Sequence, residues 1–346
     1  MGEEFDKFCS FINLYNAYRQ ARKGKRGKAS VAAFEFNQEE ELIKLRDELR
    51  GGEWKPGAYS NFYIHEPKKR MISAAPFRDR VVHHALCNIL EPDWERRFIF
   101  DTYANRKFKG THQALLRANE YAKKFRYVLQ CDVEQFFPSI DHEILFGKIS
   151  AHLEDEALLG IVKLILESGV GAQTETYEMK WFEGDDLFAP ARPRGLPIGN
   201  LTSQFWGNVY LSSFDHFAKR ELRAEGYIRY VDDFLLFSND KMVLREWKEK
   251  VIIRMSKLRL TLHEPQIFPV ETGIPFLGFR VYPTHRRLKK KRGIAFQRRF
   301  RRLHQQWRMR EIERRRLDDS ARSWAAHAAW GDTYGLRRSV LGRFLL

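Results

Sequence analysis

The 346-residue sequence predicts an α+β fold. From residue 127 onward, the spacing of apolar residues gives the order strand, helix, helix, strand, helix, strand, which differs from the regular alternation of a doubly wound sheet. One of these strands carries two adjacent aspartates, Asp232 and Asp233, within an otherwise apolar run. The chain also has 61 Lys and Arg against 45 Asp and Glu, a net charge of +16, which favours a polyanionic partner such as nucleic acid.

The N-terminal region contains a basic stretch and a predicted helix. The basic stretch KGKRGK (23–28) either contacts phosphate groups or is simply solvated. Asn37 and Glu40 have the spacing of a capping box, which predicts a helix that ends at Gly51-Gly52. Its expected apolar side consists of Leu42, Ile43, Leu45 and Leu49.

Alternating aromatic and polar residues over 59–73 predict strands, and the following segment has helical spacing. We expect that helix to end at Pro92, because proline lacks the backbone N–H that a helix interior needs. His83 and His84 lie on it, and packing or a polar face explains them better than ligand binding, since no partner ligand is near in the sequence.

The central part gives several further elements. Thr111 is expected to cap a helix that reaches about Phe125, and Asp141 to cap the next one. YVLQCD (127–132) reads as a short strand. Further helices are expected at 156–168, 202–222 and 241–258.

The C-terminal segment 297–316 is predicted to be one helix with a docking face and a basic surface. Phe300, Leu303, Trp307 and Ile312 recur at roughly helical spacing, and Arg fills most other positions. Such a helix suits contact with a nucleic-acid backbone, although a solvated arginine-rich helix has the same pattern.

Cysteine usage and hydropathy bear on the compartment. Cys9, Cys87 and Cys131 are far apart and match neither zinc-ligand nor disulfide-framework spacing. The N-terminus lacks the basic and apolar regions of a signal peptide, and no apolar run approaches the roughly 18 residues of a membrane span. We therefore expect a soluble, cytoplasmic protein with no membrane partner.

The paired aspartates need an explanation, because unpaired buried carboxylates are costly and adjacent ones repel. A hairpin turn between two short strands is one reading. Metal binding is the other, and Asp132 supports it because it ends the strand 127–132, where ligand groups often collect. Oxygen ligands suit two magnesium ions that activate a 3′-hydroxyl and stabilise departing pyrophosphate.

Six motifs, in order, resemble those of reverse transcriptases. They are RMIS (70–73), YANRKFKGTHQA (103–114), DVEQFFPSID (132–141), RGLPIGNLTSQFWGNVYL (194–211), YVDD (230–233) and FLGF (276–279). Within that superfamily, LPIGNLTSQ and the ending SWAAHAAWGDTYGL (323–336) are most similar to reverse transcriptases of bacterial and phage diversity-generating retroelements. Many other members carry Gln-Gly in place of Ile198-Gly199.

The resemblance implies a right-hand polymerase that uses two Mg²⁺ ions, for which Mn²⁺ could substitute. Asp132, Asp232 and Asp233 would be the catalytic acids and metal ligands, with the backbone of Val133 as a further ligand. Other implied roles are dNTP binding by Arg70, Arg106, Phe137 and Gly199, template fidelity at Ile198, and a primer grip of Phe276, Leu277 and Gly278. Ordinary structural readings stay open: a core side chain for Phe137, surface ion pairs for both arginines, a plain turn at Gly199 and a buried β-turn at FLGF.

The resemblance also implies an organisation and a biology. We expect an N-terminal extension (1–36), fingers with part of the palm (37–126), palm (127–284) and a basic helical thumb (285–346). The expected partners are template RNA, cDNA, dNTPs and a small basic oligomer, the accessory variability determinant. The implied function is copying that is error-prone at template adenines, in mutagenic retrohoming. Two alternatives are a related reverse transcriptase in antiphage defence and a non-catalytic RNA-binding scaffold.

Overall fold

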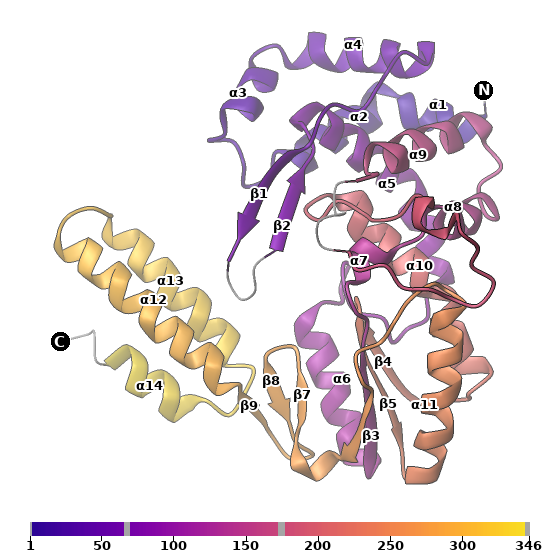
Figure 1. Ribbon diagram of the computed structural model, residues 1–346. Helices are drawn as coiled ribbons and strands as arrows, with labels where there is room; N and C mark the ends of the chain where they lie inside the picture. Colours follow the sequence, from indigo (N-terminus) through magenta and orange to yellow (C-terminus); the bar gives the residue numbers. More distant parts are fainter. Residues whose placement is uncertain (1, 66–69, 172–176, 343–346) are drawn as a thin grey trace. The chain divides into compact units, whose positions relative to one another are not determined.

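A computed structural model describes residues 2–65, 70–171 and 177–342 and divides the chain into two compact units (Figure 1). Both units are built from segments that are far apart in the sequence. The first comprises Met1–Phe100, Asp132–Leu222 and Glu249–Glu264, and the second comprises Asp101–Cys131, Arg223–Lys248 and Pro265–Leu346. The predicted domain boundaries stay predictions.

The N-terminal helices of the first unit pack around one long helix. The packing helices are α1 (Glu3–Cys9), α2 (Phe11–Ala21), α3 (Ala29–Phe36) and α4 (Gln38–Gly51). The long helix is α5 (Phe77–Arg97). The predicted capping box is wrong: Asn37 lies between α3 and α4 with φ −113° and ψ 40°, and its side chain makes no cap hydrogen bond. Ile43 is 37% exposed instead of packed. The predicted end is confirmed, because Gly52 is left-handed with φ +71°.

Pro92 does not end its helix, contrary to the prediction. Helix α5 continues five residues further, to Arg97. Leu90 and Trp94 are both buried, on either side of the proline. Packing of this face therefore outweighs the hydrogen bond that proline cannot make.

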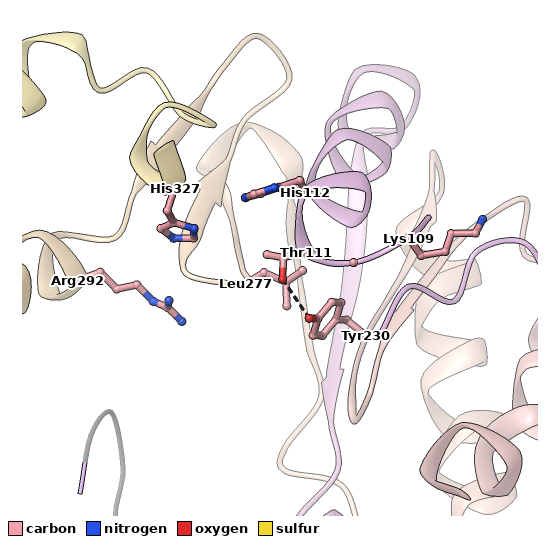
Figure 2. A pocket seen from close by; sticks show the side chains of 8 residues that line it. Lys109, Thr111, His112, Tyr230, Leu277, Arg292 and His327 are labelled. Carbon is pink, nitrogen blue, oxygen red and sulfur yellow. Dashed lines mark hydrogen bonds between the residues drawn. The ribbon is translucent and has the colours of Figure 1, made fainter. Parts of the chain in front are cut away.

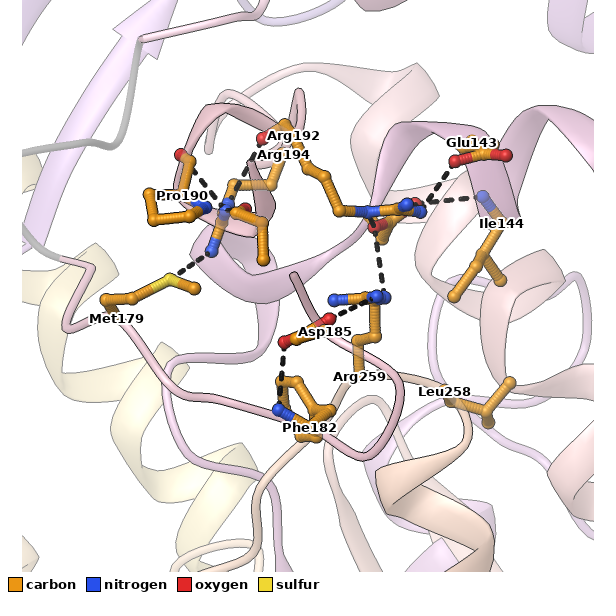
Figure 3. A network of polar contacts seen from close by, with 12 residues as sticks. Glu143, Ile144, Met179, Phe182, Asp185, Pro190, Arg192, Arg194, Leu258 and Arg259 are labelled. Carbon is orange, nitrogen blue, oxygen red and sulfur yellow. Dashed lines mark hydrogen bonds and ion pairs between the residues drawn. The ribbon is translucent and has the colours of Figure 1, made fainter. Parts of the chain in front are cut away.

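The remainder of the first unit contains a hairpin and further helices. The strands predicted over 59–73 are confirmed as β1 (Ser60–Ile64) and β2 (Arg70–Ala74), and the structure shows that they pair antiparallel. The helices are α7 (Phe136–Ser139), α8 (His142–Ser150), α9 (Glu156–Ser168), a 3₁₀ turn at Ala189–Ala191 and α10 (Leu201–Arg220). The expected cap of α8 is confirmed: Asp141 accepts the N–H of Ile144 at 3.0 Å, within a larger polar network (Figure 3).

The second unit is organised around a four-stranded sheet of order β4-β5-β3-β6. Its strands are β3 (Tyr127–Asp132), β4 (Gly226–Tyr230), β5 (Asp233–Ser238) and β6 (Gln266–Pro269), and β3–β6 and β4–β5 pair antiparallel. Helix α6 (Thr111–Lys124) contributes Leu115, Ala118 and Tyr121 to the same core as β3, β4 and β5. The prediction that Thr111 caps α6 is wrong: Thr111 is the first helical residue, and Gly110 with φ +93° occupies the cap position. Helix α11 (Lys241–Ser256) begins in this unit and ends in the first.

The C-terminal part of the second unit has a small sheet and three helices. Strands β7 (Ile274–Phe276), β8 (Phe279–Val281) and β9 (Arg286–Leu288) follow a 3₁₀ turn at Val270–Thr272 and precede α12 (Lys290–Arg308), α13 (Arg314–Ala328) and α14 (Tyr334–Gly342). The single helix predicted over 297–316 is wrong, because the chain turns after Arg308 with Arg310 at φ +61°. This turn lets Trp324 stack on Phe296, with ring centroids 4.2 Å apart.

The α+β prediction is confirmed: the structure combines helices with sheets in which the strand pairs β1–β2, β3–β6, β4–β5, β7–β8 and β8–β9 are antiparallel. Cys9, Cys87 and Cys131 are buried free thiols. Within the described ranges, we find no helix with the length and apolar character that crossing a membrane requires.

Candidate active site

Asp232 and Asp233 lie at a tight hairpin between β4 and β5. Tyr230 pairs with Asp233, so Val231 and Asp232 form a two-residue loop. Both aspartates are half-buried, whereas the flanking strand residues Phe234 to Phe237 are buried. The hairpin explains how two like charges are accommodated: the turn keeps both carboxylates at the edge of the core and within reach of solvent.

Asp233 has polar neighbours within the second unit. The side-chain amide of Gln130 lies 3.4 Å from its Oδ1. Lys289 is a second polar neighbour of Asp233. Burial lowers the pKa of this lysine, and the negative charge of Asp233 acts in the opposite direction. Gln130 lies on β3, the neighbour of β5 in the sheet, two residues before the strand's final residue, Asp132.

Asp132 is exposed at the end of β3 and belongs to the first unit. Its carbonyl accepts the N–H of His263 at 2.9 Å, and the next residue, Val133, bridges to Leu262. Among the residues that the structure describes, no three His, Cys, Asp or Glu side chains form a group that could hold a metal ion. Joint action of Asp132 with the hairpin aspartates therefore stays a prediction.

The loop with Ile198 and Gly199 is fixed against β2. The carbonyl of Ile198 accepts the N–H of Ser73 at 2.9 Å, and the side-chain amide of Asn200 bonds the backbone on both sides of Ala74. Gly199 has φ +116°, and a Cβ there would lie 2.8 Å from Cγ2 of Ile72. Glycine is thus needed at this position for conformation and for close packing.

Phe137 lies beside the same loop. Its carbonyl accepts the N–H of Leu196 at 2.9 Å, and its side chain is half-buried while that of Phe136 is buried. Phe136 is thus the core side chain of this pair, whereas Phe137 is partly accessible. Arg70 is exposed at the start of β2. Of the predicted dNTP-binding residues, the structure places these two and Gly199 within the first unit.

Arg106, the remaining predicted dNTP-binding residue, belongs to the second unit. Its guanidinium donates to the carbonyl of Thr102 at 3.1 Å and to the hydroxyl of the same residue. Thr102 forms a parallel bridge with Arg229 on β4. Arg106 is thereby tied to the strand that leads into the aspartate hairpin.

The predicted primer grip is the tight turn between β7 and β8. Leu277 and Gly278 have φ values of +45° and +90°, and Phe276 pairs with Phe279. Both phenylalanines are fully buried. The buried-turn reading is therefore correct for the phenylalanines, while Leu277 lines a cavity and is available to a ligand.

That cavity, of about 550 Å³, lies next to the aspartate hairpin (Figure 2). Tyr230 reaches it and bonds Thr111 through their hydroxyl groups at 3.0 Å. Its other side chains are mostly basic or imidazole groups, and His112 stacks on Trp330 with centroids 4.1 Å apart. The lining residues are Lys109, Gly110, Thr111, His112, Tyr230, Leu277, Arg292 and His327.

Sequence reasoning missed the basic lining of this cavity, because the lining residues come from five separate places in the chain. It also missed Arg229, which is 0% exposed and whose Nη1 donates to the carbonyl of Val231 at 3.0 Å. A charged residue inside the apolar strand before the hairpin was the available signal for Arg229.

One family model matches about two thirds of the chain. Residues 55–281 match "Reverse transcriptase (RNA-dependent DNA polymerase)". The chain is 25% identical to Protein YkfC of Escherichia coli, covering 74% of each chain, and 24% identical to the Group II intron-encoded protein LtrA of Lactococcus lactis, covering 65% of this chain and 38% of LtrA. A telomerase structure from Candida albicans aligns with 68% of this chain and 46% of its own, at 12% identity and a TM-score of 0.45.

Proposed function

Because the chain belongs to the reverse transcriptase (RNA-dependent DNA polymerase) family, we propose that it copies an RNA template into cDNA at the Asp232-Asp233 hairpin. Membership confirms the predicted family and enzyme class, an RNA-directed DNA polymerase, and agrees with a right-hand polymerase fold. The observation that carries the proposed site is the strained two-residue hairpin, which holds two half-buried carboxylates beside a basic cavity.

Asp132, Asp232 and Asp233 are proposed to hold Mg²⁺, with the carbonyl of Val133 as a further ligand. Their donor chemistry fits, because carboxylate and carbonyl oxygens are the ligands of hard divalent cations, and none of the three aspartates is fully buried. When bound, the ions would activate the primer 3′-hydroxyl and neutralise charge on the pyrophosphate that leaves.

Arg70, Arg106, Phe137 and Gly199 are proposed to bind the incoming nucleotide. Arg70 and Arg106 suit triphosphate oxygens, since a guanidinium binds them bidentately. Phe137 is partly accessible and would exclude a ribose 2′-hydroxyl by its bulk. Gly199 would let the backbone approach the new base pair, as it already approaches Ile72.

The cavity beside Tyr230 is proposed to receive the primer strand. Lys109 and Arg292 supply positive charge, and Leu277 supplies an apolar contact next to the hairpin. Phosphate groups favour such a basic lining. The primer-grip role of 276–278 is part of this proposal.

The test is DNA synthesis by the full chain, purified with its native RNA and supplied with dNTPs and Mg²⁺. The Asp232→Asn/Asp233→Asn variant should lose about a thousandfold in rate, which corresponds to roughly 4 kcal/mol of lost charge stabilisation. Asp318→Asn/Asp319→Asn is the matched control, because it neutralises an adjacent aspartate pair on α13 with exposed side chains. Equal rates for the two double variants would overturn the assignment.

Within the family, we propose the diversity-generating lineage, with mutagenic copying at template adenines. The support is Ile198, whose apolar side chain cannot make the hydrogen bonds of the glutamine in other members, and the sequence ending 323–336. Ile198→Gln should lower the error rate at template adenines, while Ile198→Leu should not. Both variants keep the hydrogen bond from the Ser73 N–H to the carbonyl of residue 198, because it involves only the backbone. We therefore expect both variants to fold as the unmodified protein does. An unchanged adenine error rate in the glutamine variant would remove this support.

The accessory variability determinant is proposed as partner on the same lineage argument. Antiphage defence remains the rival biology, and similarity to an intron-encoded protein and to intron maturases of Arabidopsis thaliana favours a third possibility, a reverse transcriptase that acts on an intron-like RNA. Sequencing the cDNA distinguishes them, because its template is a variable-gene repeat, another noncoding RNA or an intron. Absence of any synthesis would favour the non-catalytic scaffold.

A further inference from the structure

The first 54 residues lie outside the segment that matches the reverse transcriptase family, and they contain an unusual run of charge. Between Lys7 and Phe34 there is no Asp or Glu. The same stretch holds seven basic residues: Lys7, Arg19, Arg22, Lys23, Lys25, Arg26 and Lys28. A basic stretch of this kind favours a polyanionic partner.

Helix α2 presents two faces of different character. Leu14, Ala17 and Tyr18 are fully buried, on the side that packs against α5. The opposite face carries aromatic and apolar side chains at the surface: Phe11 is 37%, Ile12 74% and Tyr15 36% exposed. Their exposure is not explained by packing within the first unit.

The aromatic residues of this face form an ordered stack. The rings of Phe11 and Tyr15 are nearly parallel, at 8°, with centroids 6.4 Å apart. One turn further along, the guanidinium of Arg19 lies over the Tyr15 ring, 5.9 Å from its centroid. Positions 11, 15 and 19 are four residues apart, so the three planar groups follow one line along the helix.

The loop after α2 extends the basic character of the face. Arg22 and Arg26 are engaged by Glu35, whereas Arg19 and Lys23 are exposed. Planar side chains on which bases stack, next to cations that follow a backbone, are the two components of a site for single-stranded nucleic acid.

We propose that the α2 face, formed by Phe11, Ile12, Tyr15, Arg19 and Lys23, binds unpaired nucleotides of an RNA. This face shares no residue with the proposed polymerase site. Unpaired bases are required, because only they expose the faces that Phe11 and Tyr15 can stack against. The inference is independent of which RNA the enzyme copies.

The aromatic part is tested by binding of a labelled, mixed-sequence, single-stranded 12-nucleotide RNA to the full chain, first saturated with an unlabelled template–primer duplex. Phe11→Ala/Tyr15→Ala should weaken binding about tenfold or more. Leu187→Ala/Phe188→Ala is the matched control: it also removes two exposed apolar side chains, but beside Asp185 and Asp186. The control should bind as the unmodified protein does.

The charged part has a different signature. Arg19→Gln/Lys23→Gln should reduce the slope of log affinity against log salt by about 0.7 for each phosphate that the protein no longer neutralises, whereas the aromatic double variant should leave the slope unchanged. Primer extension on a short template should be unaffected in both variants, which separates this proposal from the catalytic one.

The proposal fails if the aromatic variant binds the RNA within twofold of the unmodified protein. It also fails if the variant loses as much affinity for an RNA duplex or for polyglutamate as for the single strand, because charge attraction alone would then explain binding. Crosslinks of a 4-thiouridine RNA should map to the peptide that contains residues 11–19, and crosslinks confined to other peptides would overturn it.

Discussion

Val231 adopts a backbone conformation that β-branched residues avoid, with φ +59°. It lies directly before Asp232, in the two-residue loop of the hairpin. Strain of this kind costs on the order of 1–3 kcal/mol and persists only where surrounding contacts impose it. The Nη1 of buried Arg229 donates to the Val231 carbonyl at 3.0 Å, and the backbone of Arg229 bonds Asp101 and Tyr103. Arg229 is therefore a positioning residue for the aspartates.

Replacing Arg229 by Met tests this role, since the side chain keeps much of its length and loses its donors. We expect the rate of dNTP addition to fall about tenfold or more, because an unpaired carbonyl costs about 1–3 kcal/mol and the loop is freed to relax. Arg245→Met, at an exposed site on α11, is the control. Thermal melting of the same variants measures folding. In a Val231→Gly background, where the positive φ is no longer strained, Arg229→Met should reduce the rate of dNTP addition by a smaller factor. A purely structural arginine would show no such coupling.

At the scale of elements, Asp141 connects three segments of the first unit. Figure 3 labels its partners Ile144, Arg192 and Arg259. Besides capping α8, its carboxylate accepts Nε of Arg192 at 2.9 Å and lies 3.7 Å from Nε of Arg259. Arg259 also pairs with Asp185. The buried carboxylate of Asp141 thus links the start of α8 to two other segments. One contains Arg192 and precedes the Ile198 loop, and the other contains Arg259 and follows α11.

Asp141→Ala should therefore cost more than an ordinary helix cap. We expect a loss of about 3–5 kcal/mol in the free energy of unfolding, because two arginines lose a buried partner. Asp155→Ala is the matched comparison: Asp155 caps α9 and also accepts the N–H of Phe5, but it pairs with no arginine among the described residues. Its expected cost is about 1–2 kcal/mol. Urea denaturation of both variants, together with Asp141→Asn, measures the difference, and equal costs would contradict the network's role.

At the scale of the molecule, local sequence signals predicted elements well and their limits less well. The strand 127–132 matches β3 in full, and the Asp141 cap is correct, because both depend on residues adjacent in the chain. The errors at Pro92, Thr111 and 297–316 arise where packing between distant segments decides the backbone. The site was predictable as a set of motifs. The cavity lining depends on tertiary structure and had no local pattern, whereas Arg229 had a local signal, a charged residue within the apolar strand before the hairpin.

The whole chain carries a charge of +16 at pH 7, and acid adds to it. His83 on α5 is 1% exposed, and its Nδ1 has no hydrogen-bond partner among the described residues. Burial, with smaller contributions from His84 and Arg80, lowers its pKa to about 3. The folded state therefore keeps this imidazole neutral under conditions where the unfolded chain, with an ordinary pKa near 6.5, takes up the proton.

The sign of the resulting pH dependence follows directly. Below about pH 6.5 the unfolded state binds more protons, so the free energy of unfolding falls as pH drops toward 3, by up to about 1.4 kcal/mol per pH unit for this one group. His83→Met removes the titration without removing the packing, so we expect a shallower loss of stability between pH 6.5 and 4.5. His65→Met, at an exposed position, is the comparison variant. Unfolding by urea at a series of pH values measures both, and parallel curves for the unmodified protein and His83→Met would show that other groups govern its sensitivity to acid.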